Sequence, residues 1–214
     1  MSATSRIVTL QEAADILLAK AEAQDRLLVA IVGAPGSGKS TLAQSLAAML
    51  SAGGGGAAAI LPMDGYHYDD IILNERGMRQ RKGASDTFDV GGLAHMLKRL
   101  RDNREAEIYV PVFDRTLEIA RAAARVIRSD EGIILVEGNY LLLDEHPWND
   151  LAPLFDVSIM IRVAEDELRR RLTRRWQKYG ISEPEIPLKV EQNDLPNGRF
   201  VNEKSSPADL VIEN

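Results

Sequence analysis

The sequence contains no cysteine, and this absence excludes disulfide bonds, thiolate metal sites and a cysteine nucleophile. It also lacks an excess of basic residues, because 26 Lys and Arg stand against 32 Asp and Glu, a net charge of -6. A general nucleic-acid binder depends on a basic surface, so that class of function is disfavoured. No stretch reaches the roughly 20 apolar residues of a membrane span, and the N-terminus has no signal-peptide core. We therefore expect a cytoplasmic protein with no membrane span and no nucleic-acid partner.

The residues that are present form an ordinary globular mixture, 45% apolar and 27% charged, and 214 residues suit a single domain spanning 1–214. Short apolar runs that alternate with helical patterns are typical of a parallel sheet covered by helices on both faces. The candidate strands are 27–32, 57–61, 107–112, 132–136, 157–162 and 209–213. The helical patterns are 10–23, 39–50, 91–103, 116–127 and 165–178. We predict a three-layer α/β/α fold with a mainly parallel five-stranded sheet.

Three segments lie outside this alternation. The TLQE sequence at 9–12 has the spacing of a capping box and predicts an N-terminal helix within 1–24, which is our candidate for a homodimer contact. Residues 53–56 are four glycines and predict a flexible connection. Residues 180–207 are rich in Pro, Asn, Gly and charge, and we interpret them as a long irregular flap. A lid and this flap together would cover about 163–207.

The strongest motif is GAPGSGKS at 33–40, which fits G-x-x-x-x-G-K-[ST] without departure and stands between a strand pattern and a helix pattern. Its glycines allow successive backbone N–H groups to surround phosphate oxygens, and the positive end of the following helix dipole points at the anion. Lys39 supplies a charge to the β- and γ-phosphates, and the Ser40 hydroxyl is a ligand for Mg²⁺. The expected phosphate contacts come from Gly33, Ala34, Pro35, Gly36, Ser37, Gly38, Lys39, Ser40 and Thr41. The motif predicts a P-loop NTPase.

The end of another strand narrows the class of NTPase. A GTPase selects guanine with an N-K-x-D sequence, which is absent, and the strand at 132–136 does not end in the D-x-x-G of a switch region. It ends instead in Glu137, and an acid that closes an apolar strand is the Walker-B arrangement, in which a carboxylate reaches Mg²⁺ or its waters. An ordinary strand-end acid is the alternative. A motor ATPase would need a longer chain, so we favour a small-molecule kinase with Ser40 and Glu137 at the Mg²⁺.

Asp64 is the candidate proton acceptor of such a kinase. It closely follows the strand at 57–61, and the carboxyl ends of parallel strands share one edge of the sheet, so we expect it beside Glu137 and the P-loop. A carboxylate there can take the proton of an attacking hydroxyl or help to hold Mg²⁺. Tyr66 and His67, on the same turn, offer a wall and a hydrogen-bonding group to the substrate. Read alone, Asp-Gly is also a common turn pair.

A basic helix is the candidate lid. Between 162 and 178 there are seven basic residues and three acidic ones, although the whole chain is acidic. Arg170 and Arg174, and likewise Arg171 and Arg175, are spaced i,i+4 and predict two ridges of guanidinium groups. One ridge could close over the triphosphate and neutralise the transferring phosphoryl group, with Arg170, Arg171 and Arg174 as candidates. A solvated basic face is the alternative.

These motifs resemble a known family. Asp64-Gly65-Tyr66 with RKGASDTFD at 81–89 is similar to the DGF and RKGxPxxYD of bacterial type-I pantothenate kinase, and LRRRLTR at 168–174 is similar to the RLxRRxxR helix of uridine kinase. Both belong to the phosphoribulokinase/uridine kinase superfamily of P-loop kinases. Bacterial fructose transport system kinases of that superfamily share MDG[FY]H, KGxxDTFDVxGL, VPVFDR, VEGNYLLL and NDxPNxxxV, all present here in nearly these forms. The resemblance covers 27 to about 178.

The resemblance implies roles for individual residues. Asp64 would be the catalytic base. Asp86 matches the acid that holds sugar hydroxyls in uridine kinase, although it could instead brace the loop at 81–89. Phe113 and Arg115 lie in the segment that contacts the acceptor, where the planar fork of the arginine could meet a carboxylate, a phosphate or hydroxyl groups.

The expected activity is an ATP- and Mg²⁺-dependent transfer of the γ-phosphate to a hydroxyl of a small molecule, with Lys39 and Asp64 catalytic. A sugar such as fructose is one candidate acceptor. Uridine, cytidine or pantothenate are alternative acceptors. The lid departs from the uridine kinase pattern at Glu167 and Arg175, which disfavours a nucleoside. The turn-rich 192–198 is a plain loop or touches the substrate or adenine. An alternative of another class is a nucleotide-dependent regulatory or transport-associated ATPase in which Asp64 orients water.

Overall fold

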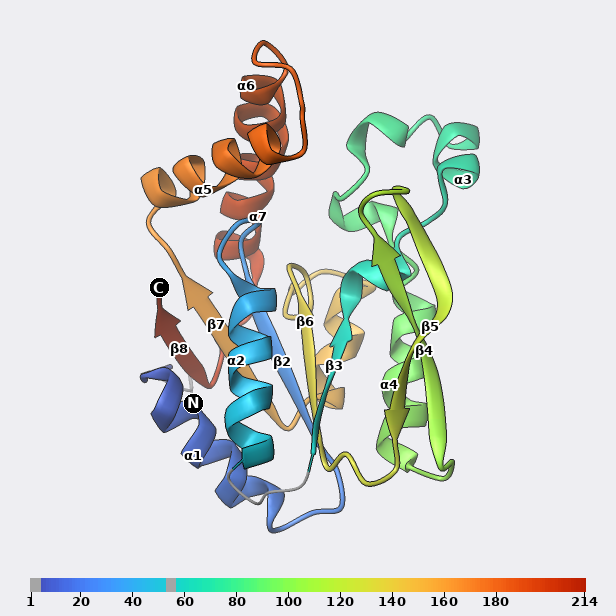
Figure 1. Cartoon of the computed structure of the whole chain (residues 1–214), viewed down its shortest axis with the longest axis vertical. Coiled ribbons are helices and arrows are strands. Elements are labelled where there is room, and N and C mark those ends of the chain that lie inside the picture. The colour runs from blue at the N-terminus through green and yellow to red at the C-terminus, as the bar shows by residue number, and fades with distance from the viewer. Residues whose placement is uncertain (1–4, 53–56) are drawn as a thin grey trace.

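The computed structural model describes residues 5–52 and 57–214, so the predicted glycine connection lies outside the described residues. In this part of the chain the central sheet has six strands, all paired in parallel, in the order β1-β8-β7-β2-β6-β3 (Figure 1). They are β1 (Arg6–Ile7), β2 (Leu27–Gly33), β3 (Ala58–Pro62), β6 (Ile133–Gly138), β7 (Val157–Arg162) and β8 (Leu210–Glu213). The parallel sheet is confirmed, with six strands rather than five. The two residues of β1 are too few to show a pattern in the sequence.

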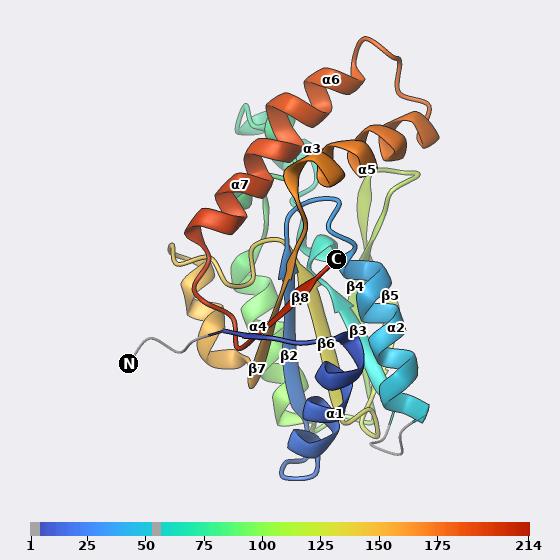
Figure 2. The same ribbon diagram turned by 90° about the vertical axis from the view of Figure 1, so that its left-hand side faces the viewer.

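Alternate residues of β2 point to opposite faces of the sheet, and each face has its own apolar core. Leu28 and Val32 belong to one core, while Leu27 and Ile31 belong to the other. The helices that cover the two faces are α1 (Leu10–Ala21), α2 (Lys39–Ala52) and α4 (Val90–Asp102). Helices α1 and α2 pack on the face of Leu27, and α4 packs on the face of Leu28 (Figure 2). The three-layer α/β/α prediction is therefore confirmed.

The N-terminal helix α1 begins with the predicted capping box. The Thr9 hydroxyl accepts a hydrogen bond from the Glu12 N–H at 3.2 Å, and the Glu12 carboxylate accepts one from the Thr9 N–H at 2.8 Å. Ala13, Ala14 and Leu17 of α1 are buried in the second core. The apolar face of this helix is thus used within the chain itself.

The segment 116–127 is not a helix, which corrects the prediction. It forms most of β5 (Ile119–Arg128), the antiparallel partner of β4 (Glu107–Asp114) in a hairpin beside the main sheet. The alanine-rich sequence has high helix propensity, but strand pairing overrides propensity, which is a weak signal. The Asp114 carboxylate accepts hydrogen bonds from two N–H groups of the hairpin turn at 3.0 and 3.2 Å, and Ile127 is fully buried. The predicted strand at 107–112 is therefore present as β4, but it belongs to this two-stranded sheet and not to the main one.

Residues 180–207 are largely helical rather than an irregular flap, which is a second correction. After α5 (Glu165–Lys178) come α6 (Ile186–Lys189), a π-helical turn (Val190–Asp194) and α7 (Leu195–Lys204). We call 165–204 the lid. Turn-forming residues hid these helices in the sequence, but Pro196 lies in the first turn of α7, where a missing N–H is tolerated. Ile186 and Val190 pack against Leu172 of α5 in a small apolar core.

None of the helices in the described ranges is long and apolar enough to cross a membrane. The remaining helical elements are short: α3 (Asp70–Glu75) and the 3₁₀ turns Met63–Tyr66, Arg79–Arg81, Ser85–Thr87 and Trp148–Leu154. Three of these 3₁₀ turns lie between β3 and α4, in the connection that carries the motifs after Asp64.

An ion-pair cluster at Glu165 joins two helices of the lid. Its carboxylate accepts hydrogen bonds from Arg169 of α5 at 3.0 Å and from Arg199 of α7 at 2.7 Å. The hydrogen bonds from Arg199, with those from Arg169, lower the pKa of Glu165 to about 2. A carboxyl group with a lowered folded pKa stabilises the fold above its ordinary pKa of 4.5, and this contribution is lost as the pH falls toward 2.

We therefore expect Glu165→Gln to lower the Tm at neutral pH, by an amount that shrinks as the pH falls from about 5 to about 3. Thermal unfolding followed by circular dichroism across this range measures the difference. Asp166→Asn is the matched control, because Asp166 bonds Arg169 from a fully exposed position and does not reach α7. It should lower the Tm less. A Glu165→Gln deficit that stays constant across this range would contradict the expectation.

Candidate active site

The carboxyl ends of β2, β3 and β6 lie at one edge of the sheet, below a cavity of about 850 Å³. The P-loop at 33–40 follows β2, Asp64 follows β3, and Glu137 lies at the end of β6. The lid forms one wall of the cavity, and the loop at 79–83 with the tip of the β4–β5 hairpin forms the other (Figure 1). The shared edge was predicted from the parallel order of the strands, and the structure has it.

The P-loop has the backbone that its glycines allow. Gly36 and Gly38 have φ values of 79° and 93°, which residues with a Cβ rarely adopt. The Lys39 ammonium folds back over the loop and donates to the carbonyl oxygens of Gly33 and Ala34, both at 3.0 Å. Burial lowers the pKa of Lys39 to about 8. Ser37 Oγ is buried, has no hydrogen-bond partner in the described chain and does not line the cavity.

Two oxygen groups meet beside the P-loop. The Ser40 hydroxyl donates a hydrogen bond to Glu137 Oε1 at 3.0 Å, joining the start of α2 to the end of β6. Burial raises the pKa of Glu137, and the charge of Asp64 raises it further. A hydroxyl and a carboxylate side by side are hard oxygen ligands of the kind that Mg²⁺ prefers, together with phosphate oxygens.

Asp64 lies in the 3₁₀ turn after β3 and forms an ion pair with Arg115. The turn fits because residue 65 is glycine: a Cβ there would lie 2.5 Å from the carbonyl oxygen of Pro111. Burial by itself would raise the pKa of Asp64, but the charges of Arg115 and then His67 lower it below its usual value. Asp64 is therefore ionised at neutral pH and able to accept a proton, although Arg115 holds it.

Aromatic and basic side chains form the wall opposite the lid, which we call the acceptor wall. The His67 ring contacts the rings of Phe88 and Phe113, with centroids 4.0 and 4.7 Å apart. Lys82 and Arg115 approach the Phe113 ring at 5.2 and 5.8 Å. His67, Phe113 and Arg115, all predicted to meet the substrate, line the cavity together.

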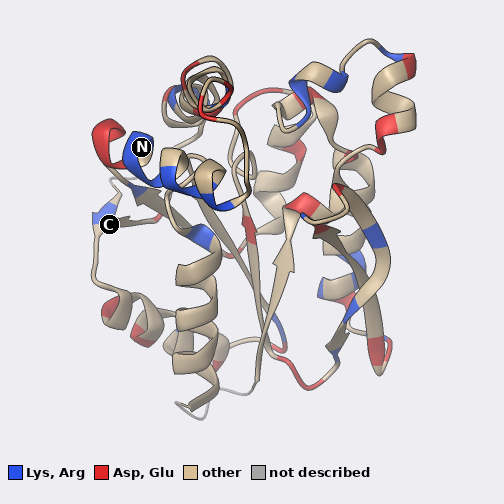
Figure 3. Ribbon diagram, turned by 45° about the horizontal axis from the view of Figure 1, so that its top comes forward, with Lys and Arg blue, Asp and Glu red and all other residues tan. Residues whose placement is uncertain are grey.

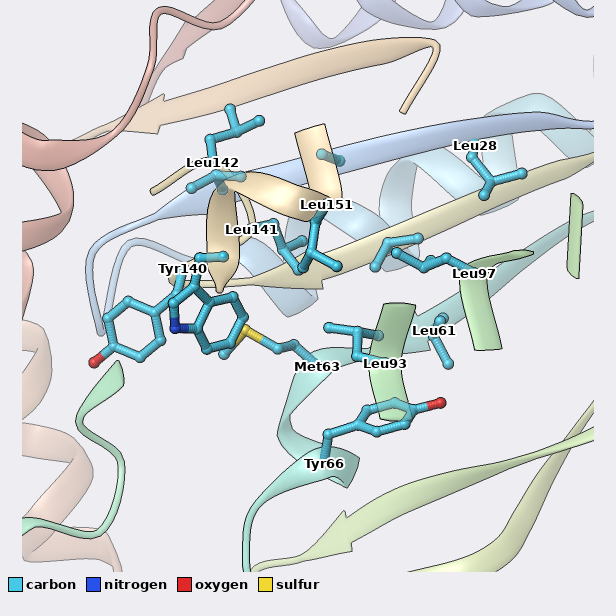
Figure 4. Close-up of a cluster of buried hydrophobic side chains, with 14 of the residues drawn as sticks. Leu28, Leu61, Met63, Tyr66, Leu93, Leu97, Tyr140, Leu141, Leu142 and Leu151 are labelled. Carbon is cyan, nitrogen blue, oxygen red and sulfur yellow. The ribbon is translucent and has the colours of Figure 1, made fainter. Parts of the chain in front are cut away.

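Two other predicted substrate residues do not line this cavity. The Tyr66 ring is buried in the apolar core near Met63 and Leu93 (Figure 4). Its hydroxyl has no partner among the residues that the structure describes, and burial raises its pKa. The Asp86 carboxylate pairs with Arg81 at 3.1 Å, which matches the alternative that Asp86 braces its own loop.

The lid presents one of its two arginine ridges to the cavity. Arg171 and Arg175 line the cavity, and Arg171 also bonds Glu167 at 2.7 Å. Arg170 and Arg174 do not line the cavity, and Arg170 is paired with Glu167 at 2.6 Å. The basic residues of α5 are coloured blue in Figure 3. Arg175 was not among the predicted catalytic residues, yet its charge acts on both Lys39 and Asp64. The i,i+4 spacing of Arg175 from Arg171 is the feature of the sequence that indicates that both face the cavity together.

The turn-rich segment at 192–198 is part of the cavity rather than a plain loop. Gln192, Asn193, Asp194 and Asn197 line it. Asp194 is buried, and its Oδ2 accepts a hydrogen bond from the Trp176 indole at 2.6 Å. Burial raises the pKa of Asp194. The sequence leaves the place of this segment open, because Asn, Asp and Pro are usual in turns.

The chain is similar to several kinases. A family model described as an AAA domain matches residues 29–191. A protein of Schizosaccharomyces pombe named "putative uridine kinase" is 32% identical over 197 residues, which cover 89% of this chain and 84% of that protein. A pantothenate kinase of Myxococcus xanthus is 29% identical over 71% of this chain and 50% of its own length. A crystal structure of a "putative fructose transport system kinase" from Silicibacter sp. TM1040 is 40% identical, with a TM-score of 0.87 over 95% of this chain and 98% of that one.

Proposed function

Because the chain belongs to the phosphoribulokinase/uridine kinase superfamily of P-loop kinases, we propose that it transfers the γ-phosphate of ATP to a hydroxyl group of a small molecule. One observation supports this most directly: a single cavity contains the P-loop lysine, the bonded pair Ser40 and Glu137, and the ionised carboxylate of Asp64. A hydrolase would need the same phosphate site but no acceptor wall.

The residues around the P-loop fit a nucleotide with Mg²⁺. Bound MgATP would supply the electrophilic γ-phosphoryl group. Lys39 and the backbone N–H groups of 34–41 would hold its phosphates. Ser40 and Glu137 would hold Mg²⁺ through their oxygens. Mg²⁺ commonly takes one or two protein oxygens and completes its shell with phosphates and waters, so this small set is sufficient.

The remaining side chains divide the work of transfer. Asp64 accepts the proton of the acceptor hydroxyl at a carboxylate oxygen as that hydroxyl attacks. Lys39, Arg171 and Arg175 surround the transferring group with positive charge. The lid covers the cavity and excludes water, which would otherwise compete as the acceptor. Catalysis of this kind rests on positioning and electrostatics, so one base is enough.

The names of the relatives suggest acceptors without deciding between them. The Silicibacter protein suggests fructose, the S. pombe protein uridine, and the M. xanthus enzyme pantothenate. Fructose, uridine and pantothenate all contain a hydroxyl group, which is what this site would phosphorylate. His67, Phe113 and Arg115 are the side chains we propose to contact it.

The test is ATP consumption with Mg²⁺ against a panel of hydroxyl acceptors that includes sugars, nucleosides and hydroxy acids, with mass spectrometry to detect a phosphorylated product. We expect a new phosphomonoester on at least one acceptor, and its loss when EDTA removes the metal. ATP loss that is the same with every acceptor, and without a phosphorylated product, would overturn the kinase proposal and favour a regulatory ATPase.

A further inference from the structure

The contact between Arg115 and Asp64 raises a question about the proposed transfer. Asp64 has to accept a proton, yet its carboxylate is already bonded to a guanidinium group. A carboxylate in an ion pair is a weaker base than a free one, because protonation would break the pair. Arg115 bonds one carboxylate oxygen, Oδ2, so proton transfer to Asp64 is favoured when Arg115 moves away as the acceptor binds. A guanidinium keeps its charge at all accessible pH values, so Arg115 is then able to pair with another anion.

A second cation stands on the same wall. Lys82 and Arg115 lie 5.2 and 5.8 Å from the centroid of the same Phe113 ring. The Lys82 side chain is only 7% exposed, and its ammonium is held by Asp70 at 2.6 Å and by the carbonyl oxygen of Glu118 at 2.7 Å. Asp70 also pairs with Arg79 at 2.7 Å, so one carboxylate serves two cations. This wall holds more positive charge than its bonded partners neutralise.

Basic residues outnumber acidic ones where the acceptor wall lines the cavity, although the protein has a net charge of -6. Four cations of this wall line the cavity, namely Arg79, Arg81, Lys82 and Arg115, and two acids do so, Asp64 and Glu118. Three carboxylates are bonded to them, those of Asp64, Asp70 and Asp86. One of these three, Asp64, loses its negative charge when it accepts the proton as the base. The P-loop and the lid supply their own cations to a triphosphate, namely Lys39, Arg171 and Arg175, so we assign the cations of the acceptor wall to the acceptor.

We propose, resting on the kinase function above, that the acceptor is an anionic hydroxyl compound whose carboxylate or phosphate group takes Arg115 away from Asp64. Lys82 lies next to this anion and adds its charge. Arg115 exchanges its contact with Asp64 for a contact with the acceptor, so Asp64 is released only when an anionic acceptor is bound. A neutral sugar offers no replacement for the ion pair and leaves Arg115 bonded to Asp64.

The transfer step balances without any further reactant. The acceptor hydroxyl oxygen forms a bond to the γ-phosphorus, and the bond from that phosphorus to the β,γ-bridging oxygen breaks. ADP leaves, and the hydroxyl proton goes to Asp64. The anionic group of the acceptor is unchanged and only binds.

The first experiment compares acceptors in matched pairs that differ in one anionic group. Glycerol is compared with glycerate and with glycerol phosphate, pantothenyl alcohol with pantothenate, and fructose with fructose 6-phosphate. The carboxylate and phosphate arms distinguish the two kinds of anion. We expect phosphorylation of an anionic member at a kcat/KM at least ~10-fold above its neutral counterpart, as for a hydrogen bond between charged groups. A neutral member phosphorylated as well as its anionic partner would overturn the anionic acceptor while leaving the kinase function intact.

The second experiment tests the contact between Arg115 and Asp64 without needing the right acceptor. Arg115→Met should raise ATP hydrolysis in the absence of acceptor several-fold, because water can then lose its proton to an unblocked Asp64. Adding Asp64→Asn to this variant should remove the increase. Arg121→Met is the control, since Arg121 lies on the same hairpin and pairs with Asp114 at 3.3 Å outside the cavity. Unchanged or lower hydrolysis in Arg115→Met would overturn the proposal.

Discussion

Asp64→Asn is expected to reduce phosphoryl transfer by about 10²- to 10⁴-fold, the usual contribution of a general base, while MgATP still binds. Asparagine keeps the size and shape of the side chain but cannot accept a proton. The P-loop itself does not depend on this carboxylate, because Lys39 is held by the carbonyl oxygens of Gly33 and Ala34. The first measurement is the kcat for an acceptor of the panel that the native chain phosphorylates. The second is the Kd for MgATP, measured by calorimetry.

Asp86→Asn is the matched control for this variant. Asp86 comes from the same stretch of motifs, but it pairs with Arg81 and does not line the cavity. Its replacement should change kcat only a few-fold. If Asp64→Asn retained kcat within ten-fold of the native chain, Asp64 could not be the base. If both variants lost activity equally, the effect would lie in the loop and not in proton transfer.

The parts of the site that the sequence predicts are those set by local backbone chemistry. The P-loop needs glycines at the turn and a lysine at the start of the helix, and both are visible as letters. The meeting of Asp64 and Glu137 follows from one topological fact, that parallel strands end at the same edge of a sheet. No knowledge of side-chain packing is required for either inference.

Errors arose where two local preferences compete and tertiary structure decides. The alanine-rich stretch of β5 favours a helix when it is considered alone, but its pairing with β4 selects a strand. The lid after 180 contains turn-forming residues, yet Ile186 and Val190 have a helical partner in α5 against which they pack. Tyr66 shows the same limit at one residue, because the turn that exposes Asp64 directs the next aromatic ring into the core.

The orientation of the lid helix was, by contrast, available from the sequence. Leu168 and Leu172 are the buried residues of α5, so they fix which side of the helix faces the protein. At about 100° per residue, Arg174 lies roughly 160° from Leu172, on the far side of the helix. Arg175 lies about 60° from Leu172, beside the buried stripe. The angles thus place Arg174 away from the protein, and in the structure the ridge of Arg171 and Arg175 lines the cavity.

This orientation leads to the second large effect. Arg175→Met should lower kcat by about 10³-fold or more at saturating MgATP, in the range found for arginines that neutralise a transferring phosphoryl group. Methionine keeps a long side chain and high helix propensity, so α5 should remain folded. Arg174→Met is the matched control on the neighbouring residue and should change kcat only a few-fold. Equal losses of kcat in the two variants would mean that the lid acts through its general charge or that both variants disturb its folding. A loss of kcat confined to Arg174→Met would place the ridge of Arg170 and Arg174 over the phosphates. A loss confined to Arg175→Met would make this residue, at which the lid departs from the uridine kinase pattern, the part of the lid that acts on the transferring group.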